Sequence, residues 1–166
     1  MPPGFVLLAA AATVGALATL FWQPRAAFVW NASASAPLGL YRVGDPGPLR
    51  SGDMVIAILP QAARRLAAQR GYLPANVPAV KRIAAIPGDT ICAIGPVISI
   101  NGRRVAERRR RDAIGRRLPW WEGCTTIRPG QLFLLMADAA ASFDGRYFGP
   151  SEAAAIVGRA YPLCVR

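Results

Sequence analysis

The fold class is decided by Val97-Ile98-Ser99-Ile100-Asn101-Gly102-Arg103-Arg104-Val105, a stretch near the middle of the chain. Asn101-Gly102 is the dipeptide that most favours a type I′ turn, and the runs on either side of it are β-prone, so the stretch predicts a β-hairpin. Four other short apolar runs, each bounded by Gly, Pro or Asp, also indicate strands: 54–58, 79–86, 90–94 and 131–136. Only 61–70, where Ala and Leu alternate with pairs of Arg, has the pattern of an amphipathic helix. We therefore expect a mainly β fold.

The composition limits the chemistry that the chain can perform. Of its 166 residues, 53% are apolar and 17% are charged, which is typical of one globular domain and not of a disordered segment. The lack of histidine excludes Ser-His-Asp and Cys-His catalysis and histidine-containing zinc sites. Three cysteines, Cys92, Cys124 and Cys164, form no Cys-x-x-Cys pair, which argues against a zinc ribbon or a thioredoxin-type motif. The sequence implies no metal and no organic cofactor.

The chain is strongly basic, with a net charge of +11. Such a charge suits an anionic partner such as nucleic acid or a membrane surface, but a high-GC genome also enriches arginine, so charge alone assigns no function. Eight arginines lie in the segment 103–117, which has scarcely any apolar residue. We expect this arginine segment to be a solvated, mobile surface loop, with contact to anionic lipid or a partner as the alternative. No interleaved aromatic residues accompany the charge, which disfavours nucleic-acid binding.

The N-terminal region predicts a membrane anchor. Phe5–Trp22 is an uncharged run of 18 residues, which as a helix would span about 27 Å, close to the thickness of a hydrocarbon core. We expect an anchor at 1–24 and one domain at 25–166. A cleaved signal peptide is the alternative, because Ala16-Leu17-Ala18 resembles a cleavage site, although no Lys or Arg precedes the run. Four aromatic residues suit either a belt at the membrane interface or an ordinary core: Phe21, Trp22, Phe28 and Trp30.

Lys81 is the only lysine among the 20 cations of the chain, and it lies in an apolar run before a Pro87-Gly88-Asp89 turn. Burial of an ammonium group is costly, and the chain uses arginine everywhere else, which indicates a role that arginine cannot fill. A desolvated lysine can lose its proton and act as a general base, whereas a guanidinium stays charged. Without histidine, a Ser-Lys dyad is the nucleophilic arrangement most compatible with this composition. The alternative is a snorkelling lysine on a strand face.

Four motifs occur in order after the apolar N-terminal run: Ser33-Ala34-Ser35-Ala36-Pro37-Leu38-Gly39-Leu40-Tyr41, Gly52-Asp53-Met54-Val55, Lys81-Arg82-Ile83 with Pro87-Gly88-Asp89, and Ser142-Phe143-Asp144-Gly145-Arg146-Tyr147-Phe148-Gly149. Alone, the first would be a membrane-proximal linker and the last a loop with an Asp-Gly turn. In this order they resemble the signal peptidase I superfamily, and more closely its conjugative-transfer branch, the TraF-type pilin-processing peptidases. The resemblance spans most of the chain.

The resemblance implies a role for each matched side chain. Ser35 matches the nucleophile of the family and Lys81 its general base. Ser33 matches the serine whose hydroxyl joins the backbone N–H of Ser35 in the oxyanion hole, with a turn-capping hydroxyl as the alternative. Ser142 matches the serine that orients the lysine amine. A structural ion pair would support the site, formed by Asp144 and Arg146.

The resemblance also implies an antiparallel β-sheet catalytic domain with an excursion at about 101–128, behind one N-terminal transmembrane helix. Cys92 and Cys124 would pair across the excursion, with free thiols as the alternative. The chain departs from the wider family pattern at Ala36, where methionine is common, and at Gly145, where a serine is usual, and Ala139-Ala140-Ala141 is plainer than the family pattern. The first two departures are compatible with the conjugative branch and leave general preprotein processing less certain.

We therefore predict a membrane-bound serine endopeptidase of the bacterial inner membrane whose catalytic domain is periplasmic. It would process an exported pilin-like precursor for conjugative transfer or type IV secretion, by hydrolysis or by cyclisation. The expected partners are the pilin or preprotein substrate, inner-membrane lipids and the conjugation or secretion machinery. The alternatives are a general signal peptidase I, a self-cleaving Ser-Lys regulator of the repressor type, which the anchor disfavours, and a non-enzymatic basic scaffold of a secretion channel.

Overall fold

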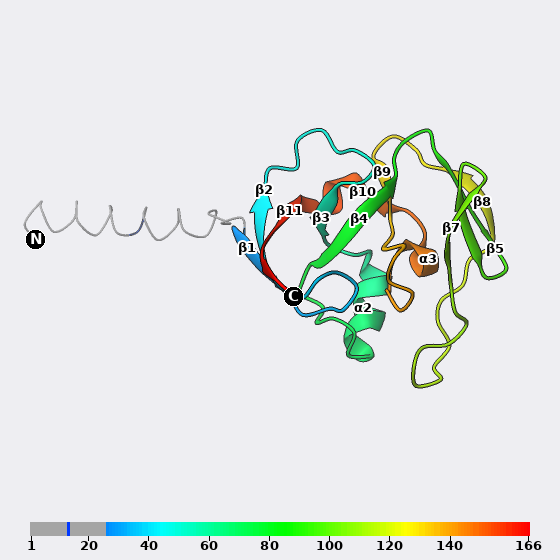
Figure 1. Cartoon of the computed structure of the whole chain (residues 1–166), viewed down its shortest axis with the longest axis horizontal. Helices are drawn as coiled ribbons and strands as arrows, with labels where there is room; N and C mark the ends of the chain where they lie inside the picture. Colours follow the sequence, from blue (N-terminus) through cyan, green and yellow to red (C-terminus); the bar gives the residue numbers. More distant parts are fainter. Residues whose placement is uncertain (1–12, 14–25) are drawn as a thin grey trace, which may run out of the picture.

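A computed structural model describes Thr13 and residues 26–166 (Figure 1). Apart from Thr13, the anchor predicted at 1–24 lies outside the described residues, and so do Phe21 and Trp22. Within the part of the chain that is described, no helix combines the length and apolarity needed to cross a bilayer.

The larger part of the domain is a seven-stranded antiparallel sheet with the strand order β1-β2-β11-β3-β4-β9-β10. The last strand of the chain is inserted between the second and the third, so pairing within this sheet is largely non-local. The strands have the following bounds: β1 Phe28–Asn31, β2 Gly39–Gly44, β3 Met54–Ala57, β4 Ala79–Ala85, β9 Gln131–Leu134, β10 Ser151–Glu152 and β11 Ile156–Val165.

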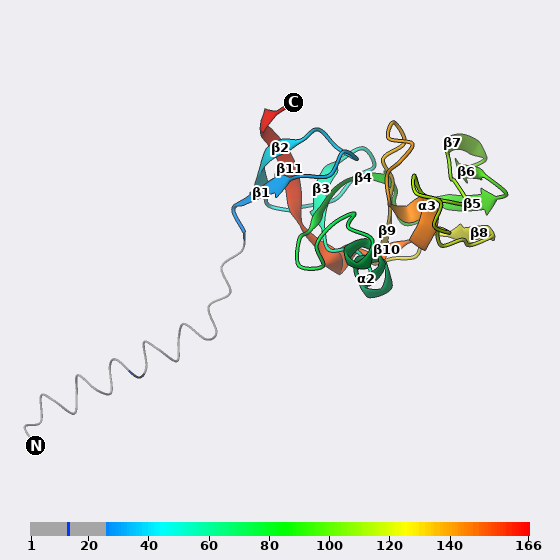
Figure 2. The ribbon, with the colours of Figure 1, turned by 90° about the horizontal axis from the view of Figure 1, so that it is seen from below.

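A four-stranded antiparallel sheet, with the order β7-β6-β5-β8, lies at the end of the domain opposite β1 (Figures 1 and 2). Its strands are β5 Thr90–Ile94, β6 Val97–Ile100, β7 Arg103–Glu107 and β8 Gly123–Thr126. Strands β6 and β7 form the predicted hairpin, and both turn residues, Asn101 and Gly102, have the positive φ angles that a type I′ turn requires, 50° and 78°. The mainly β, antiparallel fold is thus confirmed.

A disulfide joins Cys92 of β5 to Cys124 of β8, where the two residues face each other in the register of the sheet. This is the pairing that the family resemblance implies. Cys164, on β11, is a free and exposed cysteine. The four-stranded sheet therefore carries a covalent link between its edge strand and a central strand.

Over residues 26–166, two short α-helices and a 3-10 turn accompany the sheets: α2 Gln61–Gln69, α3 Gly145–Phe148 and η1 Ala153–Ala155. Helix α2 occupies the predicted helical segment and buries Ala63 and Ala67, and Ala63 packs in a cluster with Leu59 and with Ala79 of β4. Residues from both sheets form one buried cluster that joins them: Ala85, Ile91, Ala93, Ile98, Ile127, Phe133 and Leu135. The small sheet is therefore packed on β4 and β9, which carry or adjoin the candidate site.

Most arginines of the segment 103–117 are exposed, as predicted, but the prediction of a solvated loop is wrong for 103–107 and for Arg108. Residues 103–107 form β7, and Arg108 is only 3% exposed. The guanidinium of Arg108 stacks on Trp120, 3.6 Å from the ring centroid, and that of Arg110 lies 4.0 Å from the same centroid. The aromatic partner, Trp120, lies on the returning limb of the excursion, outside the segment 103–117.

Candidate active site

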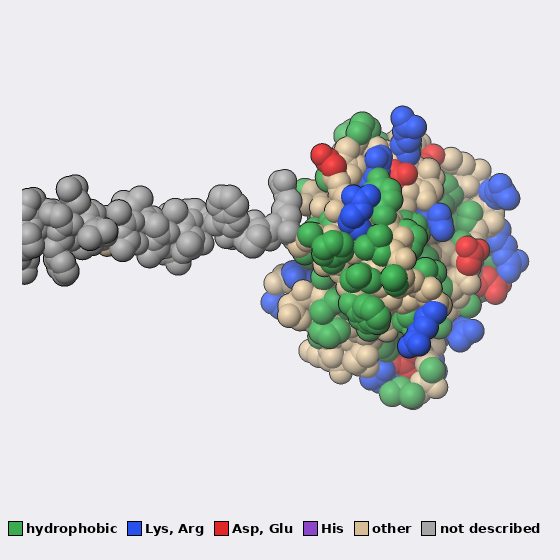
Figure 3. All heavy atoms as spheres, turned by 60° about the vertical axis from the view of Figure 1, so that its left-hand side comes forward, with side chains coloured by type: hydrophobic (Ala, Val, Ile, Leu, Met, Phe, Trp, Pro, Cys, Tyr) green, Lys and Arg blue, Asp and Glu red, His purple; other side chains and the backbone are tan. Residues whose placement is uncertain are grey.

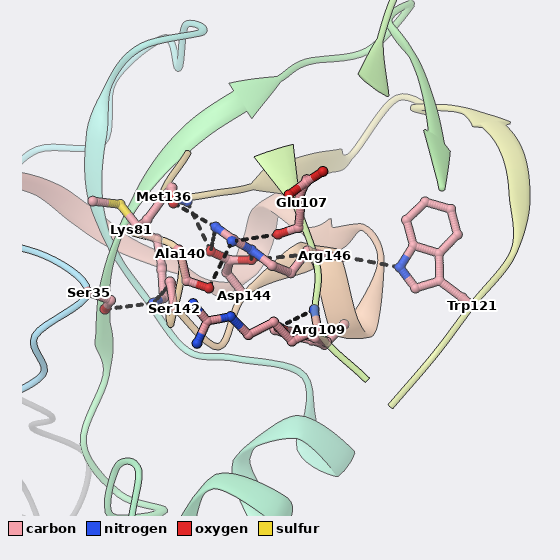
Figure 4. A network of polar contacts seen from close by, with 12 residues as sticks. Ser35, Lys81, Glu107, Arg109, Trp121, Met136, Ala140, Ser142, Asp144 and Arg146 are labelled. Carbon is pink, nitrogen blue, oxygen red and sulfur yellow. Dashed lines mark hydrogen bonds and ion pairs between the residues drawn. The ribbon is translucent and has the colours of Figure 1, made fainter. Parts of the chain in front are cut away.

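Ser35 lies in the loop 32–38 that connects β1 to β2 at one end of the large sheet. The two strands pair up to Asn31 and Gly39, after which the chain leaves the ladder. Ser35 is 9% exposed, and a backbone hydrogen bond from Ala36 N–H to Ser33 C=O closes a tight turn around it. The loop therefore presents the Ser35 hydroxyl from a constrained position, as Figure 4 shows.

Lys81 lies on β4, an interior strand of the large sheet, directly opposite Val55 of β3. It is 3% exposed, and its Nζ donates hydrogen bonds to two hydroxyls, Ser35 Oγ at 2.9 Å and Ser142 Oγ at 3.0 Å (Figure 4). No carboxylate forms an ion pair with this amine among the residues that the structure describes. A buried cation held only by neutral hydroxyls is poorly stabilised in its charged form.

Burial lowers the pKa of Lys81 from 10.5 to about 8. The nearby Asp144 charge raises this pKa and Arg146 lowers it, and both effects are smaller than that of desolvation. At pH 7, roughly a tenth of such amines are neutral, against fewer than one in a thousand for an unperturbed lysine. The amine beside Ser35 can therefore accept a proton at physiological pH.

Behind the lysine lies the ion pair of Asp144 and Arg146, both of which are buried, at 0% and 1% exposure. Arg146 Nε donates to Asp144 Oδ1 at 2.8 Å, and Nη2 donates to Oδ2 at 3.1 Å. Arg146 also donates to the carbonyls of Met136, Glu107 and Ala140, and Asp144 accepts from the backbone N–H of Met136 (Figure 4). This pair closes the turn 136–144, which holds Ser142 against the amine.

Ser33 was predicted either to form part of an oxyanion hole or to cap a turn. Its Oγ lies 2.9 Å from Ser35 Oγ and accepts a long hydrogen bond, 3.4 Å, from Ser35 N–H. The two groups assigned to an oxyanion hole by the family resemblance thus lie next to each other, and in this structure they contact each other. The turn-capping geometry and the position beside the reactive hydroxyl coexist in one side chain. The fold therefore brings together Ser33, Ser35, Lys81 and Ser142, with Asp144 and Arg146 one layer behind.

Ser33, Ser35, Lys81 and Ser142 line a cleft of about 460 Å³. Leucine and alanine side chains line much of it, including the run 139–141, so the space beside Ser35 is mostly apolar. The arginine segment contributes Arg109 and Arg111 to the lining. A cleft of this size, lined largely by small apolar side chains with a few polar groups, has the character of a ligand-binding site.

The departure at Gly145 has a packing reason. A Cβ atom at this position would lie 2.7 Å from Leu134 O and 2.7 Å from an atom of the Phe133 ring. A serine here would collide with β9, because the backbone of α3 approaches that strand closely. The glycine therefore allows the backbone of α3 to pack directly against β9.

The sequence interpretation gave no role to Asn31 or Tyr41, which hold the 32–38 loop. The Asn31 side chain makes four hydrogen bonds to the backbone of this loop, and Tyr41 OH donates to Pro37 O at 2.8 Å. An asparagine two residues before Ser33 is a signal for an Asx-type turn and could have indicated its role. Tyr41 lacks such a signal. No group of three or more His, Cys, Asp or Glu side chains suited to a metal occurs in the described part of the chain.

The sequence profile described as signal peptidase, peptidase S26, matches residues 4–164. The chain belongs to this family. This signal peptidase homologue is 35% identical over 143 residues to the conjugal transfer protein TraF of Agrobacterium fabrum, covering 80% of each chain. It is 32% identical over 130 residues to the plasmid transfer protein TraF of Escherichia coli, covering 72% of each. A crystal structure of a signal peptidase I from Enterococcus faecalis aligns with 19% identity and a TM-score of 0.41, over 69% of this chain and 98% of that one. The family resemblance is confirmed.

Proposed function

We propose that this protein is a membrane-associated serine endopeptidase that acts in conjugative transfer, with Ser35 as its nucleophile and Lys81 as its general base. The observation that carries the proposal is the Lys81 amine, buried, without a carboxylate partner among the described residues and 2.9 Å from Ser35 Oγ. Family membership supports the peptidase chemistry, and the TraF relatives support the role in conjugation.

In the proposed reaction, the neutral Lys81 amine takes the proton of Ser35 while Oγ attacks the scissile carbonyl carbon. The resulting ammonium then gives that proton to the departing amine, which leaves an acyl ester on Ser35. Ser142 accepts a hydrogen bond from Nζ at 3.0 Å and keeps the amine directed at Ser35 throughout. The lysine thus moves one proton in each direction and needs no histidine.

The tetrahedral intermediate needs hydrogen-bond donors for its oxyanion. The Ser33 hydroxyl and the Ser35 N–H are the candidate donors, and the entering carbonyl oxygen would replace the contact that they make with each other at 3.4 Å. One such donor contributes roughly 3–4 kcal/mol to the transition state of acyl-transfer enzymes.

For the substrate, we propose an exported pilin-like precursor cleaved after a small residue, in keeping with the alanine-lined cleft and the TraF relatives. The acyl ester can be resolved by water or by an amine, and attack by the amino terminus of the substrate would give a cyclic product. Intact-mass analysis of the processed pilin separates these outcomes, because the hydrolysed product is heavier than the cyclic one by one water. A general signal peptidase would instead process unrelated preproteins equally well.

For the location, we propose the bacterial inner membrane with this domain in the periplasm. Four exposed apolar side chains on β1 and β11 support a membrane-facing surface: Phe28, Trp30, Leu163 and Val165. Figure 3 shows hydrophobic side chains gathered on the side of the domain that was at the left in Figure 1. The Cys92–Cys124 disulfide is in keeping with an oxidising compartment.

The test is cleavage of a co-encoded pilin precursor by the full-length protein in detergent micelles. We expect Ser35→Ala to abolish cleavage. Ser51→Ala, which changes an exposed serine outside the cleft, is the matched control and should cleave like the wild type. A Ser35→Ala variant that still cleaves the precursor would reject the peptidase, and one that still supports conjugation in cells would favour the scaffold alternative.

A further inference from the structure

We infer that Asn31 is a positioning residue for the proposed reaction: its carboxamide holds the 32–38 loop in the geometry that sets Ser33 against Ser35. This inference rests on the proposed function, because positioning matters only if Ser35 reacts. Asn31 is the last residue of β1 and is 4% exposed. Its Nδ2 lies 3.0 Å from three carbonyl oxygens of the loop, those of Ser33, Ala36 and Pro37.

The same side chain also accepts a hydrogen bond, because Ser33 N–H donates to Asn31 Oδ1 at 3.1 Å. The peptide groups on both sides of Ser33 are therefore fixed by one carboxamide. Fixing this backbone directs Ser33 Oγ at Ser35 Oγ, 2.9 Å away.

An asparagine is required here for a physical reason. The chain leaves the β1–β2 ladder after Asn31 and Gly39, so the loop backbone has no neighbouring strand to pair with. Buried peptide groups need hydrogen-bond partners, and here they need a donor and an acceptor from one short side chain. Aspartate would keep the acceptor and lose both N–H donors, and alanine would lose all four bonds. The carboxamide of asparagine supplies two N–H donors and one acceptor from a short side chain.

The first test is the steady-state kinetics of precursor cleavage by Asn31→Ala. We expect kcat to fall about tenfold to a hundredfold while KM stays within about threefold, because Asn31 itself does not line the cleft and its loss acts mainly on the oxyanion geometry. Tyr41→Phe is the matched control, since it removes one hydrogen bond to the same loop, at Pro37, without contact to Ser33. It should lower kcat by less than about threefold.

The second test is a double-variant cycle with Ser33→Ala. If Asn31 acts through the Ser33 hydroxyl, then Asn31→Ala should cost little further activity once that hydroxyl is absent. Losses that multiply, or an Asn31→Ala enzyme with wild-type kcat, would overturn the inference. If Asn31→Ala does not fold, Asn31→Asp keeps the shape and the acceptor, and it should still lose about tenfold in kcat. Cleavage by Ser35→Ala would instead reject the proposed function itself.

A different observation assigns a second role: we propose that Arg109 selects a carboxylate on the substrate. Arg109 is exposed and lines the cleft with Ser35 and Lys81, and Figure 4 shows its side chain extending toward Ser142. Its guanidinium has no hydrogen-bond or ion-pair partner within the described part of the chain. Its backbone is fixed, since Arg109 N–H donates to Tyr147 OH at 3.2 Å.

The carboxylate that lines the same cleft cannot neutralise Arg109. Asp112 is already occupied by Arg116, whose Nε donates to it at 2.6 Å, and it also accepts from Tyr72 OH. With Lys81 neutral in the reactive state, one wall of the cleft keeps an uncompensated positive charge. A carboxylate is the anionic group that a peptide substrate carries, and a guanidinium can bind it through two parallel hydrogen bonds.

The test uses synthetic peptides that span the cleavage site of the pilin precursor, with Glu, Gln or Lys placed at each position in turn and with a free or amidated C-terminus. At one position, or at the C-terminus, we expect the wild type to prefer the carboxylate at least about tenfold in kcat/KM over its neutral form. Arg109→Glu should reverse the Glu-over-Lys preference, or abolish the preference for a free C-terminus, while Arg103→Glu, on exposed β7, should change neither. Equal preferences in wild type and Arg109→Glu would overturn the assignment, whereas no cleavage by the wild type would reject the proposed function.

Discussion

Lys81 and Arg108 are buried to the same extent, each 3% exposed, but they lie in regions that treat a buried cation in opposite ways. Beside the small sheet, Arg108 donates to the carbonyls of Gly95 and Trp121, lies 3.2 Å from a Glu122 oxygen and stacks on Trp120. In the large sheet, Lys81 contacts two neutral hydroxyls. Burial lowers the pKa of both groups, but a guanidinium starts so high that it stays charged. The same burial therefore leaves the arginine as a charged structural group and gives the lysine a larger neutral fraction near pH 7.

The largest expected effect is that of Lys81→Arg, which places a guanidinium, the kind of cation found at Arg108, in the large sheet. The variant keeps the charge but cannot lose its proton, so we expect kcat/KM for precursor cleavage to fall at least about a thousandfold at neutral pH. Circular dichroism of the purified variant checks that the fold is intact. Full processing by a folded Lys81→Arg enzyme would show that no neutral amine is needed.

The next effect is on stability and concerns the buried ion pair behind the lysine. Arg146→Ala leaves the Asp144 carboxylate buried without its partner, and we expect the free energy of unfolding to fall by about 3–5 kcal/mol. Urea denaturation measures this loss. The exposed pair of Arg104 and Glu107 is the control, and Arg104→Ala should cost less than about 1 kcal/mol. Similar losses for the two variants would mean that burial of the pair is unimportant.

Replacing Lys81 by a neutral side chain should stabilise the protein while it abolishes activity. Below pH 8, the folded wild type carries a desolvated charge, and the shift in pKa from 10.5 to about 8 corresponds to a penalty of about 3 kcal/mol. Between pH 8 and 10.5, the folded amine is neutral while the unfolded one still binds a proton, so wild-type stability rises with pH. We expect Lys81→Met to be more stable by up to about 3 kcal/mol at pH 7.

Urea denaturation of Lys81→Met and the wild type at several pH values checks this prediction. The difference between the two proteins should shrink as the pH rises through this window. A difference that does not change between pH 7 and 10.5 would contradict the lowered pKa, whatever its size.

The smallest effect is expected for Arg108→Lys, the converse exchange in the small sheet. An ammonium cannot reach both carbonyls and stack on Trp120 as the planar guanidinium does, so we expect unfolding to require about 1–2 kcal/mol less. Thermal unfolding measures the loss. If the variant is as stable as the wild type, the carbonyl and aromatic contacts of Arg108 contribute little, and the contrast between the two cations rests on Lys81 alone.

Local signals predicted the local parts of the fold. The Asn101-Gly102 turn and the helix at 61–70 follow from residues next to each other in the chain, and the solitary Lys81 pointed to the site because its chemistry differs from that of every other cation. Insertion of β11 between β2 and β3 has no such signal, because it depends on pairing between distant strands.

Burial of Arg108 was missed for a related reason. A run of arginines reads as a solvated surface, and its aromatic partners, Trp120 and Trp121, come twelve or more residues later on the other limb of the excursion. Asn31 was missed because its four backbone bonds depend on the exact path of the loop that follows it. Sequence reasoning thus pointed more readily to the groups that we propose to react than to the groups that hold them.

The most direct test of the account is an NMR titration of the Lys81 amine. Because the chain contains a single lysine, protein labelled with ¹³Cε-lysine gives one signal, and its shift against pH reports the pKa of this side chain without assignment. We predict a midpoint near pH 8, matched by the rise of kcat/KM with pH. A midpoint at or above 10.5 in the folded, active protein would contradict it, because the amine beside Ser35 would then be charged whenever the enzyme works.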